Sequence, residues 1–280
     1  MRTLVHLSDL HFGRVDPAVL APLAQAVADA RPDVVVVSGD LTQRARRAQF
    51  REAAGFLARL PQPQVVVPGN HDVPLYDVGR RLLAPLARFR RYVHAEPFPE
   101  YADDTLTVIG VNTARALVFK GGRINRGQVG ALMRRFRALP AAHVRVVVSH
   151  HPFEQGPHAT VRDRVGRADM ARRALAGCRI DLFLSGHLHR SHQALAEPVD
   201  EGGYAGLVVH AGTATSTRGR GEANAFNVLR VTSNSLVLDT LAFDPRHARF
   251  ASVAQARYRR SPERGWALAG DRPARFPPVE

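Results

Sequence analysis

"VVVVSGDLTQR", residues 34–44, is a run of four valines that ends in Ser-Gly-Asp. Consecutive branched apolar residues predict a strand that is buried on both faces, as in a parallel sheet covered by helices. Asp40 then lies just beyond the carboxyl end of this strand. One Asp at such a place is also typical of a helix N-cap, so the stretch alone leaves both interpretations open.

The same pattern recurs four more times along the chain. Apolar strands precede "SDLH", "GNHD", "SHHP" and "GHLH", and each of them ends in Asp, Asn or His. Histidine is not a favoured N-cap, and capping does not require two histidines two residues apart. We therefore expect one shared site, formed by Asp9, His11, Asp40, Asn70, His150, His187 and His189.

Strands and helices alternate through the first two thirds of the sequence. We expect strands near 3–8, 34–38, 64–67, 105–111, 144–149 and 181–184, with helices near 17–30, 46–59, 126–138 and 167–177. After them, "YAGLVVHAGT", "AFNVLRVT" and "SLVLDTLAFD" predict successive antiparallel strands. This order predicts an α/β fold of two packed mixed β-sheets flanked by helices. We expect residues 1–245 to form the catalytic domain and residues 246–280 a basic C-terminal extension.

Composition narrows the class of protein. The chain has 280 residues, a single cysteine and no run of 18 apolar residues, so we expect neither an internal disulfide nor a transmembrane helix. The first strand begins near Thr3 without a secretory leader, which favours a cytoplasmic location. The net charge of +14 is compatible with an anionic partner, namely a phosphate ester, nucleic acid or a lipid headgroup. A composition bias of a GC-rich coding sequence is the alternative explanation.

The donor types at the shared site indicate its chemistry. Ligands of open α/β sheets bind beyond the carboxyl ends of the strands. Carboxylate, imidazole and amide oxygen donors without a thiolate suit Mn, Fe or Zn. Seven donors are too many for one ion with an open position, but they suffice for two divalent metal ions that share a carboxylate. Two such ions, roughly 3.5–4 Å apart, can promote an in-line displacement at phosphorus.

"SDLHFG", "SGDLTQ", "PGNHD", "SHHP" and "GHLH" resemble, in this order, the motifs of the calcineurin-like binuclear metallophosphoesterases. The resemblance covers about residues 3–213, and the short chain is most similar to the cyclic-nucleotide phosphodiesterase branch. It implies a metallophosphoesterase-type αββα sandwich. It also implies that one metal is held by Asp9, His11 and His189. The other would be held by Asn70, His150 and His187, and Asp40 would bridge the two ions.

The resemblance also implies catalytic and substrate-binding residues. His71 would lie near the leaving oxygen as a proton donor, and Asp72 would orient His71 through a hydrogen bond. His151 could contact the substrate or simply pack in the core. Arg44 could meet a substrate phosphate, although the sequence favours the role of an ordinary surface arginine.

The expected activity is hydrolysis of a phosphodiester, with a 3′,5′-cyclic nucleotide favoured, by a metal-bridging hydroxide. Alternatives on the same fold are hydrolysis of a phospholipid or lipid-linked pyrophosphate, of a phosphomonoester, or of nucleic acid. A non-enzymatic nucleic-acid-binding module would be expected to lack metal ligands, and this sequence retains all seven. The basic segment from Pro74 to Pro99 is a candidate specificity element, a candidate contact with an anionic membrane surface, or an ordinary solvated helix.

Overall fold

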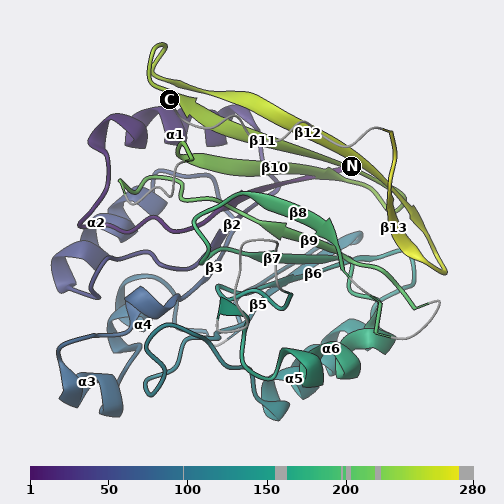
Figure 1. Ribbon diagram of the computed structural model, residues 1–280, viewed down its shortest axis with the longest axis horizontal. Coiled ribbons are helices and arrows are strands. Elements are labelled where there is room, and N and C mark those ends of the chain that lie inside the picture. Colours follow the sequence, from purple (N-terminus) through teal and green to yellow (C-terminus); the bar gives the residue numbers. More distant parts are fainter. Residues whose placement is uncertain (97, 155–162, 197, 200–202, 218–221, 271–280) are drawn as a thin grey trace.

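Two β-sheets pack face to face between two layers of helices (Figure 1). This computed structural model describes residues 1–96, 98–154, 163–196, 198–199, 203–217 and 222–270. The arrangement confirms the fold class expected from the sequence. No helix within these ranges is long and apolar enough to cross a membrane.

The first sheet has seven strands in the order β13-β12-β11-β10-β1-β2-β3. Strands β1 to β3 are parallel, and β10 to β13 form an antiparallel meander that joins them at β1. Their bounds are β1 Arg2–Leu7, β2 Val34–Ser38, β3 Gln64–Val67, β10 Ala225–Val231, β11 Ser235–Asp244, β12 Arg249–Ser261 and β13 Gly265–Leu268.

The second sheet has six strands in the order β4-β5-β6-β7-β9-β8, with a parallel centre and antiparallel edges. The bounds are β4 Glu100–Ala102, β5 Leu106–Gly110, β6 Val144–Val148, β7 Leu182–Ser185, β8 His192–Leu195 and β9 Leu207–His210. Strand β9 corrects one expectation. It was expected to start the C-terminal antiparallel series, but it pairs in parallel with β7 in this second sheet.

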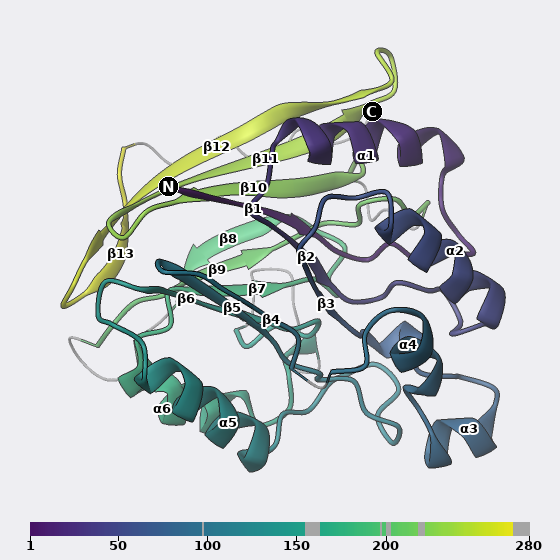
Figure 2. The ribbon, with the colours of Figure 1, turned by 180° about the vertical axis from the view of Figure 1, so that it is seen from behind.

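Helices cover the outer face of each sheet (Figure 2). Helices α1 (Pro17–Asp29) and α2 (Arg47–Leu57) lie on the seven-stranded sheet, and α5 (Arg126–Arg137) and α6 (Ala168–Leu175) lie on the six-stranded sheet. The basic segment divides at Pro85 into two short helices, α3 (Val78–Leu83) and α4 (Ala87–Tyr92), at one end of the molecule. A proline lacks the N–H of a helix interior, which explains the division.

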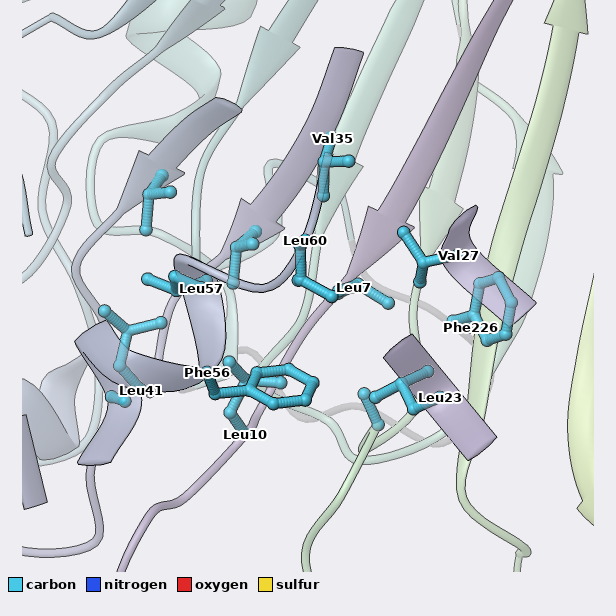
Figure 3. Close-up of a cluster of buried hydrophobic side chains, with 14 of the residues drawn as sticks. Leu7, Leu10, Leu23, Val27, Val35, Leu41, Phe56, Leu57, Leu60 and Phe226 are labelled. Atoms are coloured by element: carbon cyan, nitrogen blue, oxygen red, sulfur yellow. The ribbon is translucent and has the colours of Figure 1, made fainter. Parts of the chain in front are cut away.

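The valines of β2 show why this sequence forms a two-sided sheet. Val35 and Val37 face the helices and join the apolar cluster beneath α1 and α2, drawn in Figure 3. Val34 and Val36 face the other way and pack in the layer between the two sheets. Because side chains alternate along a strand, a strand in a central layer must be apolar at every position. A third cluster packs the six-stranded sheet against α5 and α6.

The sheet continues into the predicted C-terminal extension. Strand β12 pairs with β11 along its length, and β13 pairs with β12 at the edge of the sheet. Tyr258 and Trp266 from these two strands are buried in the layer between the sheets. Residues 249–268 therefore form part of the sandwich, and residues 271–280 lie outside the described part of the chain.

Candidate metal centre

Five loops place the predicted ligands at one edge of the sandwich. They follow the carboxyl ends of β1, β2, β3, β6 and β7, which belong to both sheets. Asp9 and His11 follow β1, Asp40 follows β2, Asn70 begins the short 3₁₀ helix η1 (Asn70–Asp72) after β3, His150 follows β6, and His187 and His189 follow β7. The parallel direction of these strands brings seven distant sequence positions together.

The first group of potential ligands contains Asp9, His11, Asp40 and His189. All four are buried, and one ligand atom from each lies within 4.8 Å of the others. His189 Nε2 lies 3.3 Å from Asp9 Oδ1 and 3.2 Å from His11 Nε2. Imidazole and carboxylate donors that converge on one point have the composition of a site for Mn, Fe or Zn.

The second group contains His150 and His187, together with His151. Asn70 Oδ1 adds an amide oxygen 3.1 Å from His150 Nε2. Asp40 Oδ2 lies 3.4 Å from His150 Nε2 and 3.7 Å from His11 Nε2, so this one carboxylate faces both groups. Asp40 therefore lies where the predicted bridging ligand should be.

His151 is placed differently from the prediction that it contacts substrate. The side chain is fully buried, with Nδ1 2.8 Å from Thr113 Oγ1 and Nε2 3.2 Å from the carbonyl oxygen of Lys120. Burial, followed by the charge of His150 and His187, holds the pKa of this imidazole well below its usual value. His151 thus ties the loop after β6 to neighbouring loops, in the packing role that the sequence left open.

Two buried polar atoms support the fit of cations to these groups. Asp9 Oδ1 and His187 Nε2 are inaccessible to solvent and have no hydrogen-bond partner among the residues that the structure describes. An unsatisfied buried polar atom costs about 1–3 kcal/mol, and such atoms are rare in folded proteins. A bound cation would satisfy both atoms.

The backbone at the ligands is strained. Asp9, His11, Asp40, His187 and His189 all have positive φ, between 49° and 73°. This left-handed conformation costs roughly 1–2 kcal/mol for a residue with a Cβ. Strained residues that cluster in this way are characteristic of functional sites, where the surrounding fold enforces a geometry that local preference opposes.

Charge pairing within the groups shifts the pKa values of their members. Burial opposes ionisation of Asp40, but the imidazole of His150 outweighs it and holds the pKa of Asp40 well below its usual range. Burial also disfavours the charged form of His150, yet Asp40 raises the pKa of His150 to about 9. Without a metal, the imidazolium of His150 therefore neutralises the Asp40 carboxylate. A metal ion must displace this proton, as is general for histidine ligands.

His71 and Asp72 depart from the predicted pairing. The Asp72 carboxylate accepts hydrogen bonds from the backbone N–H groups of Leu41, Thr42 and Gly69, and from Thr42 Oγ1. The His71 Nδ1 instead lies 2.9 Å from the carbonyl oxygen of Gln43. The prediction that Asp72 orients His71 through a direct hydrogen bond is therefore wrong. Through these hydrogen bonds, Asp72 links the turn that contains His71 to the loop that contains Asp40.

A cavity of about 220 Å³ opens beside the two ligand groups. Its walls include Asp40, Asn70, His71, His187 and His189, so it reaches both groups. Arg44 lines the cavity, and its Nη1 lies 3.3 Å from His71 Nδ1. A cavity that joins two ligand groups, a histidine and an arginine has the components needed to bind and cleave a phosphate ester.

Residues 2–191 of the 280-residue chain match the calcineurin-like phosphoesterase family. The chain belongs to that family. The resemblance drawn from the five motifs is thereby confirmed. The family supports a phosphoester hydrolase, and the two buried ligand groups are candidates for holding metal ions.

Two phosphodiesterases are similar in sequence to this phosphoesterase. It is 27% identical over 274 residues to the cAMP/cGMP dual specificity phosphodiesterase of Mycobacterium tuberculosis, a match that covers 84% of this chain and 77% of the relative. It is 38% identical over 82 residues, 25% of this chain and 29% of the relative, to the glycerophosphodiester phosphodiesterase of Enterobacter lignolyticus.

Solved structures share the fold at low sequence identity. A dimetal phosphatase from Danio rerio is 13% identical with a TM-score of 0.61, and the match covers 90% of this chain and 98% of that one. A purple acid phosphatase from yellow lupin is 12% identical with a TM-score of 0.65 over 90% of this chain. This chain spans 52% of the lupin enzyme. The metallophosphoesterase fold is thus shared by enzymes of different size.

The cavity of the phosphoesterase also has lining residues that lie outside the five motifs. Arg81, Phe119 and Lys120 are among them. Arg81 lies in the basic segment that the sequence marked as a specificity element. Phe119 and Lys120 lie in a loop without regular secondary structure, and no spacing pattern in the sequence distinguishes them from other surface residues.

Proposed function

We propose that this chain hydrolyses a phosphodiester and that a 3′,5′-cyclic nucleotide is its favoured substrate. The observation that carries the proposal is the convergence of two buried ligand groups on Asp40, beside a cavity that also contains His71 and Arg44. The similarity to a cAMP/cGMP phosphodiesterase along most of both chains supports the choice of substrate.

Each ligand group would hold one metal ion. In the proposed assignment, Asp9, His11 and His189 hold the first ion, Asn70, His150 and His187 hold the second, and Asp40 contacts both. Two divalent ions supply a water molecule of lowered pKa and neutralise charge on the phosphoryl oxygens. Asp9 Oδ1 and His187 Nε2, which lack hydrogen bonds among the described residues, would become metal donors.

His71 would donate a proton to the leaving oxygen. A carbonyl oxygen can only accept, so the 2.9 Å contact with Gln43 places a proton on His71 Nδ1. Transfer to the substrate then requires the imidazolium form of His71, which carries its second proton on Nε2, the other ring nitrogen. The alkoxide that leaves a diester is a poor leaving group, and a positioned acid accelerates its departure by about 10²–10⁴-fold.

Two cationic side chains would position the phosphate. Arg44 and Lys120 line the cavity from two different loops, and Lys120 Nζ is 3.3 Å from Asp163 Oδ1. A guanidinium can bind two phosphoryl oxygens at once, which fixes the orientation of a diester. The ring of Phe119, at the same wall, offers an apolar surface to the leaving group.

The proposal is tested by adding Mn²⁺ back to metal-stripped protein and comparing bis-p-nitrophenyl phosphate with p-nitrophenyl phosphate. We expect Mn²⁺-dependent activity with a preference for the diester, followed by hydrolysis of cyclic nucleotides. The Asp40→Ala protein, prepared in parallel, measures contaminating phosphatase. A preference for the monoester would instead assign the chain a phosphomonoesterase activity. Hydrolysis of oligonucleotides but not of cyclic mononucleotides would point to a nuclease.

A further inference from the structure

Exposed apolar side chains gather at one end of the molecule. Among the described residues, six of the nine large hydrophobic side chains that are exposed lie in two short segments, 76–83 and 117–119. The most exposed are Leu83 at 89% and Leu117 at 81%, and the others are Tyr76, Val78, Leu82 and Phe119. A concentration of this kind on a protein that is otherwise polar outside marks an interaction surface.

Contacts with Arg81 make the two segments one patch. Its guanidinium lies 4.2 Å from the centre of the Phe119 ring and donates a 3.2 Å hydrogen bond to the carbonyl oxygen of Val118. It also donates to the carbonyl oxygen of Pro74, before α3, at 2.9 Å. Helix α3 forms an outer corner of the molecule in both views (Figures 1 and 2), away from the two sheets.

The exposed arc of α3 is amphipathic. At 3.6 residues per turn, Val78, Leu82 and Leu83 occupy an arc of about 140°, and Arg80 lies at its border. The buried Arg81 lies about 60° beyond the other end of the arc, next to Val78. A short helix with an apolar outer arc and a cationic border has the pattern of a segment that lies in a membrane interface.

An arginine pocket adjoins the patch. A cavity of about 260 Å³ is lined by Arg47 of α2, Arg80 of α3, and Arg88 and Arg91 of α4. Asp77 pairs with Arg80 at 3.1 Å and is the acidic partner near Arg88 at 4.0 Å, so the pocket keeps an excess of positive charge. Burial, followed by the repulsion of Arg80, lowers the pKa of Arg88, as expected for crowded guanidinium groups.

We propose that this patch and the arginine pocket dock the protein on an anionic phospholipid surface. The apolar residues of segments 76–83 and 117–119 would enter the interface, and a headgroup phosphate would enter the arginine pocket. The positive charge of the arginine pocket favours an anionic lipid surface as the partner. A second copy of the chain, paired through the same patch, would bring two arginine pockets together and would be repelled. An anionic bilayer attracts each arginine near its surface instead.

Docking would place the catalytic cavity at the lipid surface. Arg81 and Phe119 belong both to the cavity wall and to the two segments of the patch, and Lys120, which follows Phe119, also lines the cavity. The cavity mouth would then open beside the headgroups, whichever phosphate ester it cleaves. The inference rests on the patch and the arginine pocket alone, and it holds if the proposed substrate is wrong.

Vesicle sedimentation tests the inference with the metal-loaded full chain. Vesicles of phosphatidylcholine with 30% phosphatidylglycerol, as a chosen probe, are compared with pure phosphatidylcholine at about 0.1 M salt. We expect binding to the anionic vesicles only. Leu82→Ser/Leu83→Ser and Arg47→Ser/Arg91→Ser should each weaken it by at least about tenfold, because each membrane-facing arginine alone contributes about fivefold. Leu195→Ser and Arg249→Ser, also exposed but in strands β8 and β12, are the matched controls and should bind as the unaltered chain.

Other outcomes overturn the inference. Equal sedimentation with neutral vesicles, or full binding by both altered pairs, would show that the patch and the pocket do not select anionic lipid. A dimer in analytical ultracentrifugation that Leu82→Ser/Leu83→Ser converts to monomer would assign the patch to self-association. Each variant is checked by hydrolysis of a soluble aryl ester, which should be unchanged because none of the four residues lines the catalytic cavity. If the Leu82→Ser/Leu83→Ser protein does not fold, the binding of Arg47→Ser/Arg91→Ser to anionic vesicles tests the inference by itself.

Discussion

At the scale of single residues, Asp40 and His71 have separable tasks. Asp40 faces both ligand groups through one oxygen, and its other oxygen accepts a 2.8 Å hydrogen bond from the backbone N–H of His71. The His71 ring lies next to His11, with 4.9 Å between ring centres, and is anchored on Gln43. Metal binding should therefore depend on Asp40, and proton transfer on His71.

Asp40→Ala should lose both activity and metal, whereas His71→Ala should keep two metal ions per chain. The rate of His71→Ala should fall by about 10²–10⁴-fold on a diester with an alkyl leaving group. It should fall much less with a p-nitrophenol leaving group, which departs without a proton. Steady-state kinetics with both substrates and metal analysis check this, with the exposed His247→Ala as control. Loss of metal from His71→Ala would mean that this side chain is a ligand.

The sequence was sufficient to locate these residues because their positions depend on strand ends. A run of valines predicts a buried strand. In a parallel sheet, the residues that follow such a strand lie at the edge where the carboxyl ends of the strands meet. The hydrogen-bond partners of Asp72 could not be predicted from strand ends. Its hydrogen bonds to Leu41 and Thr42 depend on how closely two loops approach, which no local pattern encodes. The burial of His151 between the loops of Thr113 and Lys120 is likewise a tertiary effect.

At the scale of elements, Arg81 joins helix α3 to the loop 115–120. The side chain is only 5% exposed, and its two hydrogen bonds reach carbonyl oxygens on both sides of the joint. Because α3 has six residues, the helix alone is too short to be stable in water. The position of α3, and with it one wall of the catalytic cavity, should depend on this arginine.

Arg81→Met should therefore loosen α3 without unfolding the protein. Methionine keeps an apolar stem but removes both hydrogen bonds, so local opening should become easier by about 2 kcal/mol. Hydrogen exchange measured by mass spectrometry should show faster exchange in peptides that cover 74–86 and 115–120 only. Arg90→Met, an exposed arginine of the neighbouring helix α4, should leave the exchange unchanged. Unaltered exchange in Arg81→Met would show that packing alone holds α3.

At the scale of the whole molecule, Asp181 connects the two sheets. It lies just before β7, and its Oδ1 accepts a 3.0 Å hydrogen bond from Trp266 Nε1 of β13 and lies 2.9 Å from Arg260 Nε of β12. Its Oδ2 accepts a 2.9 Å hydrogen bond from the backbone N–H of Arg145 in β6. One buried carboxylate thus holds the C-terminal strands of the first sheet against the second sheet.

A chain that ends at residue 245 should therefore fail to fold cooperatively, although the sequence places the domain boundary there. It would lose the buried Tyr258 and Trp266 and leave Asp181 without two of its partners, and an unpaired buried charge costs about 3–5 kcal/mol. Urea unfolding followed by circular dichroism compares residues 1–245 with residues 1–270. Equal midpoints for the two chains would show that residues 246–270 form a separate extension.

The sequence pattern did not predict that β12 belongs to the seven-stranded sheet, and the reason is physical. Its residues alternate between buried positions such as Ala256 and Tyr258 and exposed arginines, but alanine and glutamine weaken the contrast between the two faces. A strand at the border of a sheet is defined by pairing with its neighbour, here ten residue pairs with β11, rather than by its own apolar content. The central strands lack this ambiguity because both of their faces are apolar.

Two buried histidines outside the ligand groups should make stability depend on pH. Burial lowers the pKa of His6 and of His210 to about 3, so both stay neutral in the folded protein while the unfolded chain gains protons below about pH 6.5. Unfolding is thus favoured as pH falls from 6.5 towards 3, by about 2 kcal/mol per histidine at pH 5. In metal-free protein, His6→Gln should reduce the loss of stability between pH 7.5 and pH 5, measured by urea unfolding, by about that amount. His210→Gln should do the same, and the two effects should add. An undiminished loss in both variants would mean that other groups, such as the ligand histidines, carry the acid sensitivity.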